Sequence, residues 1–182
     1  MNFKLLKFYH DNMEKIFRER TMSKIHEHKS ETSDILQIVS FKIGDEEFGV
    51  DILNVQEINK MTQITKVPNA PDFVEGVINL RGRVIAVINL RTRLNLEKKE
   101  PDKDTRIIVV DIEKNTVGFI VDGVSEVLRL PVSVTEAPPA IVAGVDSEYI
   151  KSVGKLEDRL LILIDLDKVL TINEKVSLSA VA

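Results

Sequence analysis

The sequence contains no cysteine, and its three histidines all lie within the first 28 residues, at His10, His26 and His28. Without cysteine the chain can form neither a disulfide bond nor a thiolate zinc site. Beyond residue 34 the absence of histidine also removes the commonest general base and the Ser-His and Cys-His nucleophile pairs. His26 and His28 have no third ligand nearby, so two solvated histidines are a better interpretation than a metal site. We therefore expect no metal and no cofactor.

The motifs of several enzyme classes are missing as well. There is no phosphate-binding Gly-x-x-x-x-Gly-Lys-Ser/Thr loop, no Gly-x-Gly-x-x-Gly and no Gly-x-Ser-x-Gly. Asp45, Glu46 and Glu47 are consecutive acids in a predicted turn, which is more typical of a solvated tip than of a calcium loop. Asp51 or Glu57 could form half of a carboxylate pair, but no pattern identifies a partner. We predict a protein that is not an enzyme.

Charge and hydropathy exclude further classes. The formal net charge is −4, whereas general binding to nucleic acid requires a basic surface. No apolar run approaches the ~18 residues that indicate a membrane span. The first segment also lacks the continuous apolar core of a secretory signal. We expect a cytoplasmic protein that binds no nucleic acid and does not insert directly into a membrane.

Residues 1–34 differ in composition from the rest of the chain. They contain no glycine and no proline, and they carry seven Lys/Arg against six Asp/Glu. Apolar side chains recur there at roughly helical spacing, at Leu6, Tyr9, Met13, Ile16 and Phe17. A marginal helix or disordered tail outside the fold, a helix docked on the body or on another copy, and a helix at a membrane surface remain open. We treat residues 1–34 as an N-terminal extension.

The body from residue 35 onward contains an internal repeat. Residues 35–58 align with residues 104–127, and this alignment places Gly49 on Gly118, Val55 on Val124 and Glu57 on Glu126. Residues 74–94 align with residues 150–170, with Leu80 on Leu156, Arg83 on Arg159, and Leu90 and Leu94 on Leu166 and Leu170. Matched apolar positions in the same order over both blocks indicate a duplication.

Each copy predicts the same series of elements. Each copy begins with a predicted hairpin, and a proline-containing loop comes later in the copy. In the first copy the hairpin consists of "LQIVSFKI" and a run from Phe48; in the second it consists of "TRIIVVDI" and a run from Val117. A second hairpin turns at Arg81-Gly82 or at Glu157-Asp158, and a short helix-like piece ends the copy. In "RVIAVI" both alternating faces are apolar, which predicts a strand buried on two sides. Several short strands joined by tight turns favour small closed barrels, which leave no exposed sheet edge.

The predicted fold is therefore mainly β, with two related barrel lobes at roughly residues 35–96 and 104–170 of a single body spanning 35–182. Exchange of strands between the lobes is left open. Residues 97–104, "EKKEPDKD", are charged and contain one proline, so they form the expected connector.

Two charged positions are candidates for an interaction site. Glu57 ends the second run of the first copy, and its Val-x-Glu pattern recurs at Val124–Val127. Arg81 lies at a tight turn before Gly82, a residue that readily takes the positive φ such a turn requires. A solvated charge is the alternative interpretation at both positions. The second copy has Glu157 where the first has Arg81, so the turn does not require arginine, and this favours a role special to the first lobe.

At these residues the sequence resembles the CheW family of bacterial chemotaxis coupling proteins. The segments that carry the resemblance are "FKIGDEEFGVDILNVQEI", "VPNAPDFVEGVINLRGRVIAVINLR", "VGFIVDGVSEVL" and "LLILIDLDKVL", in the family order. They span nearly the whole body and exclude the N-terminal extension. The resemblance implies two five-stranded SH3-like β-barrels and an adaptor role without catalysis.

The resemblance also implies partners and site residues. It implies an adaptor that joins the cytoplasmic tips of methyl-accepting chemotaxis receptors to the regulatory domain of the histidine kinase CheA. It places the protein in membrane-associated receptor arrays, where other CheW-like domains are further candidate partners. Val55, Glu57 and Arg81 match receptor-binding positions, and Ile52 would add apolar contact. The loop "EAPPAI", with Glu136 and Ile141, matches a kinase-contacting segment, although relatives carry a basic residue and an aromatic there.

Two other functions remain alternatives from the residues alone. One is a barrel protein that binds or converts a small molecule, which a ligand-induced rise in melting temperature would reveal. The other is a pair of barrels that binds single-stranded nucleic acid. The acidic balance opposes it, and so do the few aromatic residues after residue 50, Phe73, Phe119 and Tyr149, because such sites stack bases on aromatic rings.

Overall fold

The structure, a computed structural model, describes residues 35–112, 115–138, 148–157, 159–171 and 174–175. The N-terminal extension with its three histidines and Ile141 of the expected kinase-contacting loop lie outside these residues. Among the described residues, no helix is both long and apolar enough to cross a membrane.

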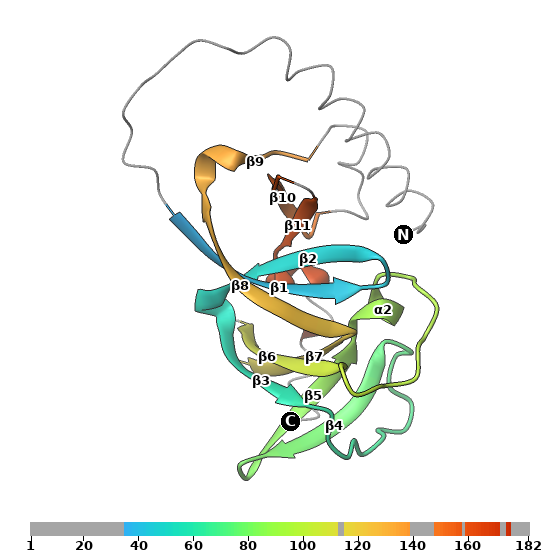
Figure 1. The fold of residues 1–182 in the computed structure, drawn as a ribbon. Coiled ribbons are helices and arrows are strands. Elements are labelled where there is room, and N and C mark those ends of the chain that lie inside the picture. The colour runs from blue at the N-terminus through green and yellow to red at the C-terminus, as the bar shows by residue number, and fades with distance from the viewer. Residues whose placement is uncertain (1–34, 113–114, 139–147, 158, 172–173, 176–182) are drawn as a thin grey trace, which may run out of the picture.

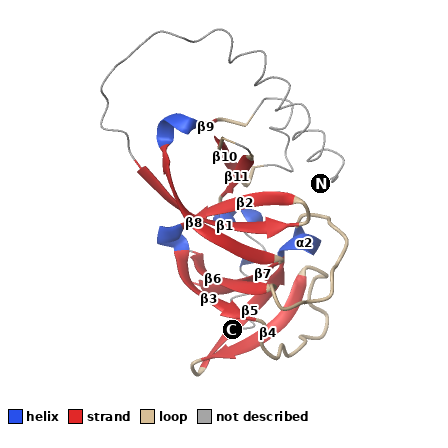
Figure 2. Ribbon diagram, viewed as in Figure 1, coloured by secondary structure: helices blue, strands red, loops and turns tan. Residues whose placement is uncertain are grey.

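The first copy of the repeat contributes five strands. They are accompanied by one 3₁₀ turn and one short helix, in the order β1 (Ile35–Ile43), β2 (Glu46–Asp51), η1 (Ile52–Asn54), β3 (Val55–Lys60), β4 (Val74–Leu80), β5 (Arg83–Asn89) and α2 (Leu90–Arg93). The second copy follows the same plan, with β6 (Arg106–Ile112), β7 (Asn115–Val121), β8 (Gly123–Pro131), η2 (Val132–Val134), β9 (Thr135–Glu136), β10 (Ile150–Lys155), β11 (Leu160–Ile164) and α3 (Leu166–Val169). The predicted hairpins and short helices are confirmed, and strands dominate the fold (Figure 2).

The two sheets each combine strands from both copies. One sheet has the order β8-β1-β2-β11-β10-β9, and the other has the order β3-β6-β7-β5-β4. The first hairpin of each copy therefore pairs with strands of the other copy, in a reciprocal exchange. We call the first sheet, with β1 and β2, lobe A, and the second, with β3 to β7, lobe B. Figure 1 shows the β1–β2 hairpin beside the later strand β8, and β6 and β7 beside β3 and β5.

Both sheets curl back towards their own beginning. In lobe A, β8 leads through η2 directly into β9, which pairs at the opposite end of the sheet. In lobe B the chain beyond β3 returns at Thr65, which exchanges two backbone hydrogen bonds with Val77 of β4, at 2.9 and 2.8 Å. Gly76 is required beside this return, because its φ is +148° and an added Cβ would lie 2.3 Å from the Thr65 carbonyl oxygen. The predicted mainly β, two-barrel fold is confirmed.

In the described part of the chain, buried apolar side chains form three clusters. The largest lies where the two sheets pack together and includes Phe41 and Phe48, whose stacked rings are 6.0 Å apart between centroids. Ile38, Leu130, Leu161 and Leu163 form a cluster on lobe A, and Ile78, Ile85, Val87, Ile107, Val109 and Ile120 form one on lobe B. Alternate residues of β5 enter two clusters, as the sequence predicted. Val84 departs from that prediction, because it lies near the end of the hairpin and is 46% exposed.

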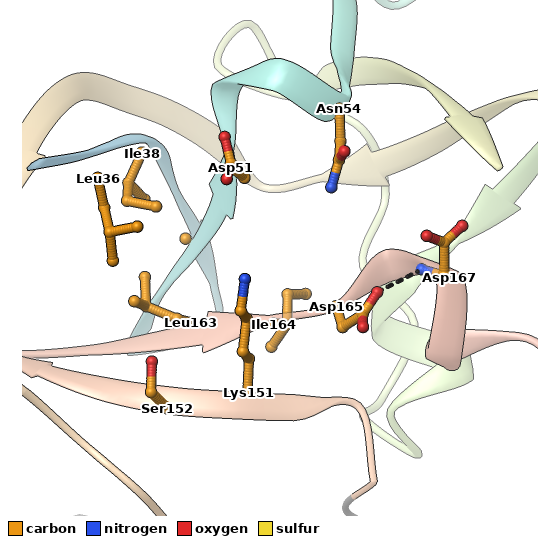
Figure 3. A pocket seen from close by; sticks show the side chains of 11 residues that line it. Leu36, Ile38, Asp51, Asn54, Lys151, Ser152, Leu163, Ile164, Asp165 and Asp167 are labelled. Carbon is orange, nitrogen blue, oxygen red and sulfur yellow. Dashed lines mark hydrogen bonds between the residues drawn. The ribbon is translucent and has the colours of Figure 1, made fainter. Parts of the chain in front are cut away.

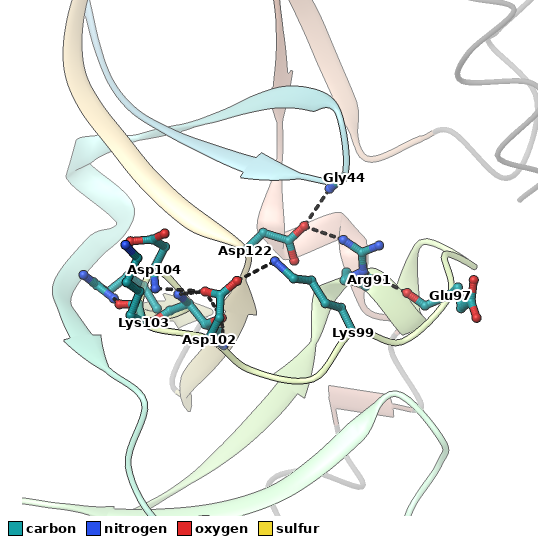
Figure 4. A network of polar contacts seen from close by, with 10 residues as sticks. Gly44, Arg91, Glu97, Lys99, Asp102, Lys103, Asp104 and Asp122 are labelled. Atoms are coloured by element: carbon teal, nitrogen blue, oxygen red, sulfur yellow. Dashed lines mark hydrogen bonds and ion pairs between the residues drawn. The ribbon is translucent and has the colours of Figure 1, made fainter.

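Polar contacts join the lobes at the crossing from β7 to β8. Asp122 accepts hydrogen bonds from the Arg91 guanidinium on α2 and from the Gly44 N–H, the latter at 2.7 Å (Figure 4). Nearby, Asp102 of the connector pairs with Lys99 at 2.7 Å and accepts the N–H of Asp104 at 2.9 Å. The Lys99 ammonium is the main cause that holds the pKa of Asp102 well below its usual range, and the Asp104 N–H adds to it. The connector is thus ordered by its own charges.

Candidate functional site

The two charged candidates, Glu57 and Arg81, contact each other. Glu57 lies on the edge strand β3, and Arg81 lies at the turn between β4 and β5, which projects at one end of the molecule in Figure 1. A guanidinium nitrogen of Arg81 lies 2.9 Å from a carboxylate oxygen of Glu57. The side chain of Arg81 is 81% exposed and that of Glu57 is 21% exposed. The sequence indicated both residues but not that they form a pair, because they are 24 positions apart.

The backbone at Arg81 is held in a conformation that arginine rarely adopts. Leu80 pairs with Arg83, so the turn contains only Arg81 and Gly82, with φ values of +53° and +84°. Two positive φ values are what a type I′ hairpin turn requires, and Asn-Gly is its preferred sequence. The side-chain oxygen of Asn79 accepts the Gly82 N–H at 2.8 Å, which further fixes the turn. The prediction for Gly82 is confirmed, whereas the left-handed Arg81 was not foreseen.

A shallow hollow opens beside the pair, at one end of the lobe B barrel. Its lining includes Glu57, Leu80, Arg81, Arg83, Ile85 and Thr116. Arg83 donates to the Thr116 hydroxyl at 2.6 Å, and that hydroxyl donates to Asp111 at 3.0 Å. The amide of Gln56 donates to the other oxygen of Asp111. The site therefore has a polar network on β3, β5, β6 and β7, with apolar side chains behind it.

The apolar candidates Ile52 and Val55 are only partly available at the surface. Both are half-buried and pack against the large cluster between the lobes. Leu53, between them, is 89% exposed, and its N–H donates to the Asp51 carboxylate at 3.0 Å. No sequence pattern indicates this exposure, because Ile52, Leu53 and Val55 are all apolar and only the 3₁₀ turn decides which of these side chains points outward. Leu53 is therefore an additional apolar candidate that sequence reasoning missed.

Lobe A carries a related charge cluster at the equivalent position. Arg159 lies 2.7 Å from Glu47 and 2.8 Å from Glu126, and Glu126 is the residue that aligns with Glu57. The interpretation of the Asp45–Glu47 turn as a solvated tip is wrong for two of its residues. Glu46 is buried, and the Glu47 side chain is 11% exposed because β2 runs inward from the turn.

The expected kinase-contacting loop is described only at its start. Glu136 lies on the short strand β9 and pairs with Lys155 of β10 at 2.8 Å. Its side chain remains 41% exposed. Ile141 lies outside the described residues.

A second hollow lies on lobe A and contains no recognisable catalytic arrangement. Leu36, Ile38 and Leu163 form one side of it, and Asp51 and Asp165 lie opposite, with Lys151 reaching between them (Figure 3). The Asp165 carboxylate already accepts the Asp167 N–H at 3.1 Å. No group of three or more acidic or histidine side chains that could hold a metal ion occurs in the described part of the chain.

The duplicated barrels, the exchanged strands and a charged pair at a lobe end define the class: a double-barrel protein whose candidate site lies at the surface of one barrel end. Comparison with known proteins identifies the family within this class. Residues 37–174 match the family model of the CheW-like domain, so the chain belongs to the CheW-like family.

Individual relatives agree with this assignment. The chemotaxis protein CheW of Klebsiella aerogenes is 38% identical over 146 residues, which cover 80% of this chain and 88% of the relative. The CheW of Helicobacter pylori is 31% identical over 160 residues, covering 88% and 96%. A crystal structure of the scaffolding protein TtCheW from Thermoanaerobacter tengcongensis superposes with a TM-score of 0.72 at 38% identity, covering 78% of this chain and 96% of that one.

Proposed function

We propose that this chain is a non-catalytic chemotaxis adaptor, which couples the cytoplasmic tips of methyl-accepting chemotaxis receptors to the regulatory domain of the histidine kinase CheA. It would act in the cytoplasm, at receptor arrays attached to the membrane. Membership of the CheW-like family carries this proposal, since curated relatives are chemotaxis proteins and one solved relative is described as a scaffolding protein.

The receptor tip is a helical hairpin, so the expected contact is a helix lying against an apolar surface with charges that fix its register. Val55 and Ile52 would supply half-buried apolar surface, and Leu53 an exposed apolar anchor. Glu57 and Arg81 would orient the helix from the end of lobe B. A central anchor contributes on the order of 2 kcal/mol to binding, whereas an exposed charge contributes about 0–1 kcal/mol.

The kinase contact is proposed for the loop that begins at Glu136 and includes Ile141. Glu136 combines 41% side-chain exposure with a fixed position against Lys155, which suits a register-setting charge at an interface. Reversing its charge with Glu136→Lys should weaken binding of the kinase regulatory domain and leave receptor binding unchanged. Equal affinity of the variant and the wild type for that domain would remove Glu136 from the contact.

A bridging assay tests the adaptor proposal. Receptor signalling fragments are immobilised, and retention of the kinase regulatory domain is measured with and without this protein. We expect retention to depend on the protein and to be lost with Arg81→Glu, because charge reversal adds repulsion where truncation only removes attraction. The matched control is Arg129→Glu on β8, an exposed arginine for which the described residues provide no ion pair. Equal bridging by Arg81→Glu and wild type would show that the receptor site is misassigned.

A further inference from the structure

The internal repeat provides a template for the charged end of lobe B. The alignment of the two copies places Glu126 on Glu57 and Arg159 on Arg83. It also places Glu47 on Thr116, since both lie near the start of the second strand of their copy. The two barrel ends therefore have the same framework and different side chains.

In lobe A the arginine is fully paired by the chain itself. The Arg159 guanidinium contacts Glu47 at 2.7 Å through one nitrogen and Glu126 at 2.8 Å through another. A planar guanidinium with several N–H groups is well suited to two carboxylates at once. The arrangement shows that this barrel end can seat a carboxylate at the position of Glu47.

In lobe B the equivalent carboxylate is missing. Thr116 stands in its place, and Arg83 contacts the Thr116 hydroxyl at 2.6 Å instead of an acid. Glu57, the counterpart of the second acid, is taken by Arg81 at 2.9 Å. Within the described residues Arg83 has no ion pair, and Asp111 reaches it only through the Thr116 hydroxyl. Of the two exposed guanidiniums beside the hollow, only that of Arg81 directly contacts a carboxylate.

We infer that this hollow accepts a carboxylate side chain from the protein partner, at the position that Glu47 fills in lobe A. Leu80 and Ile85 in the lining would contact the methylene stem of a glutamate, while Arg83 and the outer edge of Arg81 bind its oxygens. A free carboxylate would gain little at so exposed a site, whereas one presented on a docked helix loses less entropy on binding. That the partner is the receptor hairpin rests on the proposed function; the carboxylate-accepting geometry does not.

The substitution Thr116→Glu tests the geometry, because it restores the lobe A arrangement within lobe B. Arginine side-chain N–H signals are recorded by NMR, with that of Arg83 assigned through Arg83→Lys. Thr116→Glu should shift the Arg83 signal, and Thr116→Gln, which has nearly the same shape without the charge, should shift it much less. Equal shifts in the two variants would overturn the inference, because the hollow would then not favour a carboxylate.

The same variants test the partner. The affinity of a receptor signalling fragment should fall by about tenfold or more with Thr116→Glu and stay within roughly threefold with Thr116→Gln, because the internal acid occupies the site and repels the incoming one. A fragment with its tip acids replaced by amides should bind weakly and no longer distinguish the variants.

The outcomes separate the two proposals. If the wild type binds the receptor fragment and Thr116→Glu binds it equally well, the carboxylate site is wrong and the adaptor proposal stands. If the wild type does not bind receptor but Thr116→Glu shifts the Arg83 signal selectively, the adaptor proposal is wrong and the carboxylate-accepting geometry stands. Unchanged binding of the kinase regulatory domain verifies that each variant is folded.

Discussion

Replacing Arg81 by asparagine should separate the stability of the protein from its function. Arg81 has a φ of +53° in a two-residue turn with Gly82. The left-handed conformation costs an ordinary L-residue about 1–2 kcal/mol, and asparagine tolerates it far better. The substitution creates Asn-Gly, the preferred pair for a type I′ turn. The local backbone should therefore become more stable.

The loss of the ion pair acts in the opposite direction. The Arg81 side chain is 81% exposed, and a surface pair of this kind contributes about 0–1 kcal/mol. The free energy of unfolding should consequently stay constant or rise by up to about 1 kcal/mol. For a protein of this size that corresponds to a rise in Tm of about 0–4 °C. Receptor binding should fall at the same time, since the guanidinium is gone.

Thermal unfolding and receptor-fragment binding should be measured on the same preparations of wild type, Arg81→Asn and Arg81→Lys. The lysine variant keeps the charge and the strained backbone, so it should show no gain in Tm. A loss of more than about 1 kcal/mol in Arg81→Asn would mean that the pair with Glu57 outweighs the turn strain. Undiminished receptor binding would mean that Arg81 is not a contact.

Three further predictions concern the fold and the apolar anchor. Gly76→Ala should lower the free energy of unfolding by about 2 kcal/mol or more in urea unfolding, since φ is +148° and the added Cβ would lie 2.3 Å from a backbone oxygen. Gly82→Ala has open space around the added Cβ and should lose less stability. Equal losses in the two variants would contradict this ranking. Lys99 is the main cause that lowers the pKa of Asp102. The contribution of Asp102 to stability is therefore present above its unfolded pKa of about 4 and is lost as the pH falls further. Asp102→Asn should lower Tm at pH 7 and match wild type in strong acid, whereas a difference in Tm that does not depend on pH would exclude this ionic cause. Leu53→Ser should weaken receptor binding without lowering Tm, since the side chain is 89% exposed, and a clear drop in Tm would show instead that Leu53 serves the fold.

Most of the architecture could be predicted from the sequence, because the two copies repeat the same hairpins. The continuous apolar run in "RVIAVI" indicated a strand with two buried faces, and Ile85 and Ile88 do enter different clusters. The pairing of each first hairpin with the other copy could not be read from the repeat, because identical patterns fit strands of either copy equally well. Only the strand order resolves it.

The candidate site was predictable in its residues and not in its contacts. The Val-x-Glu pattern and the arginine at the turn pointed to Glu57 and Arg81, but their contact depends on how the β4–β5 turn is placed relative to β3. At Glu47 the prediction itself was wrong. A turn of consecutive acids predicts solvated side chains, but Arg159 from the second copy lies 2.7 Å from the Glu47 carboxylate. Charges whose partners lie in the other copy leave no local signal in the sequence.

The most direct test of the account is kinase autophosphorylation in a reconstituted system of receptor signalling fragments, CheA and this protein. We predict that receptor control of the kinase appears only when the protein is added, that Arg81→Glu abolishes this control and that Arg129→Glu preserves it. Kinase output that is the same with and without the protein, in the presence of receptor, would contradict the adaptor function itself.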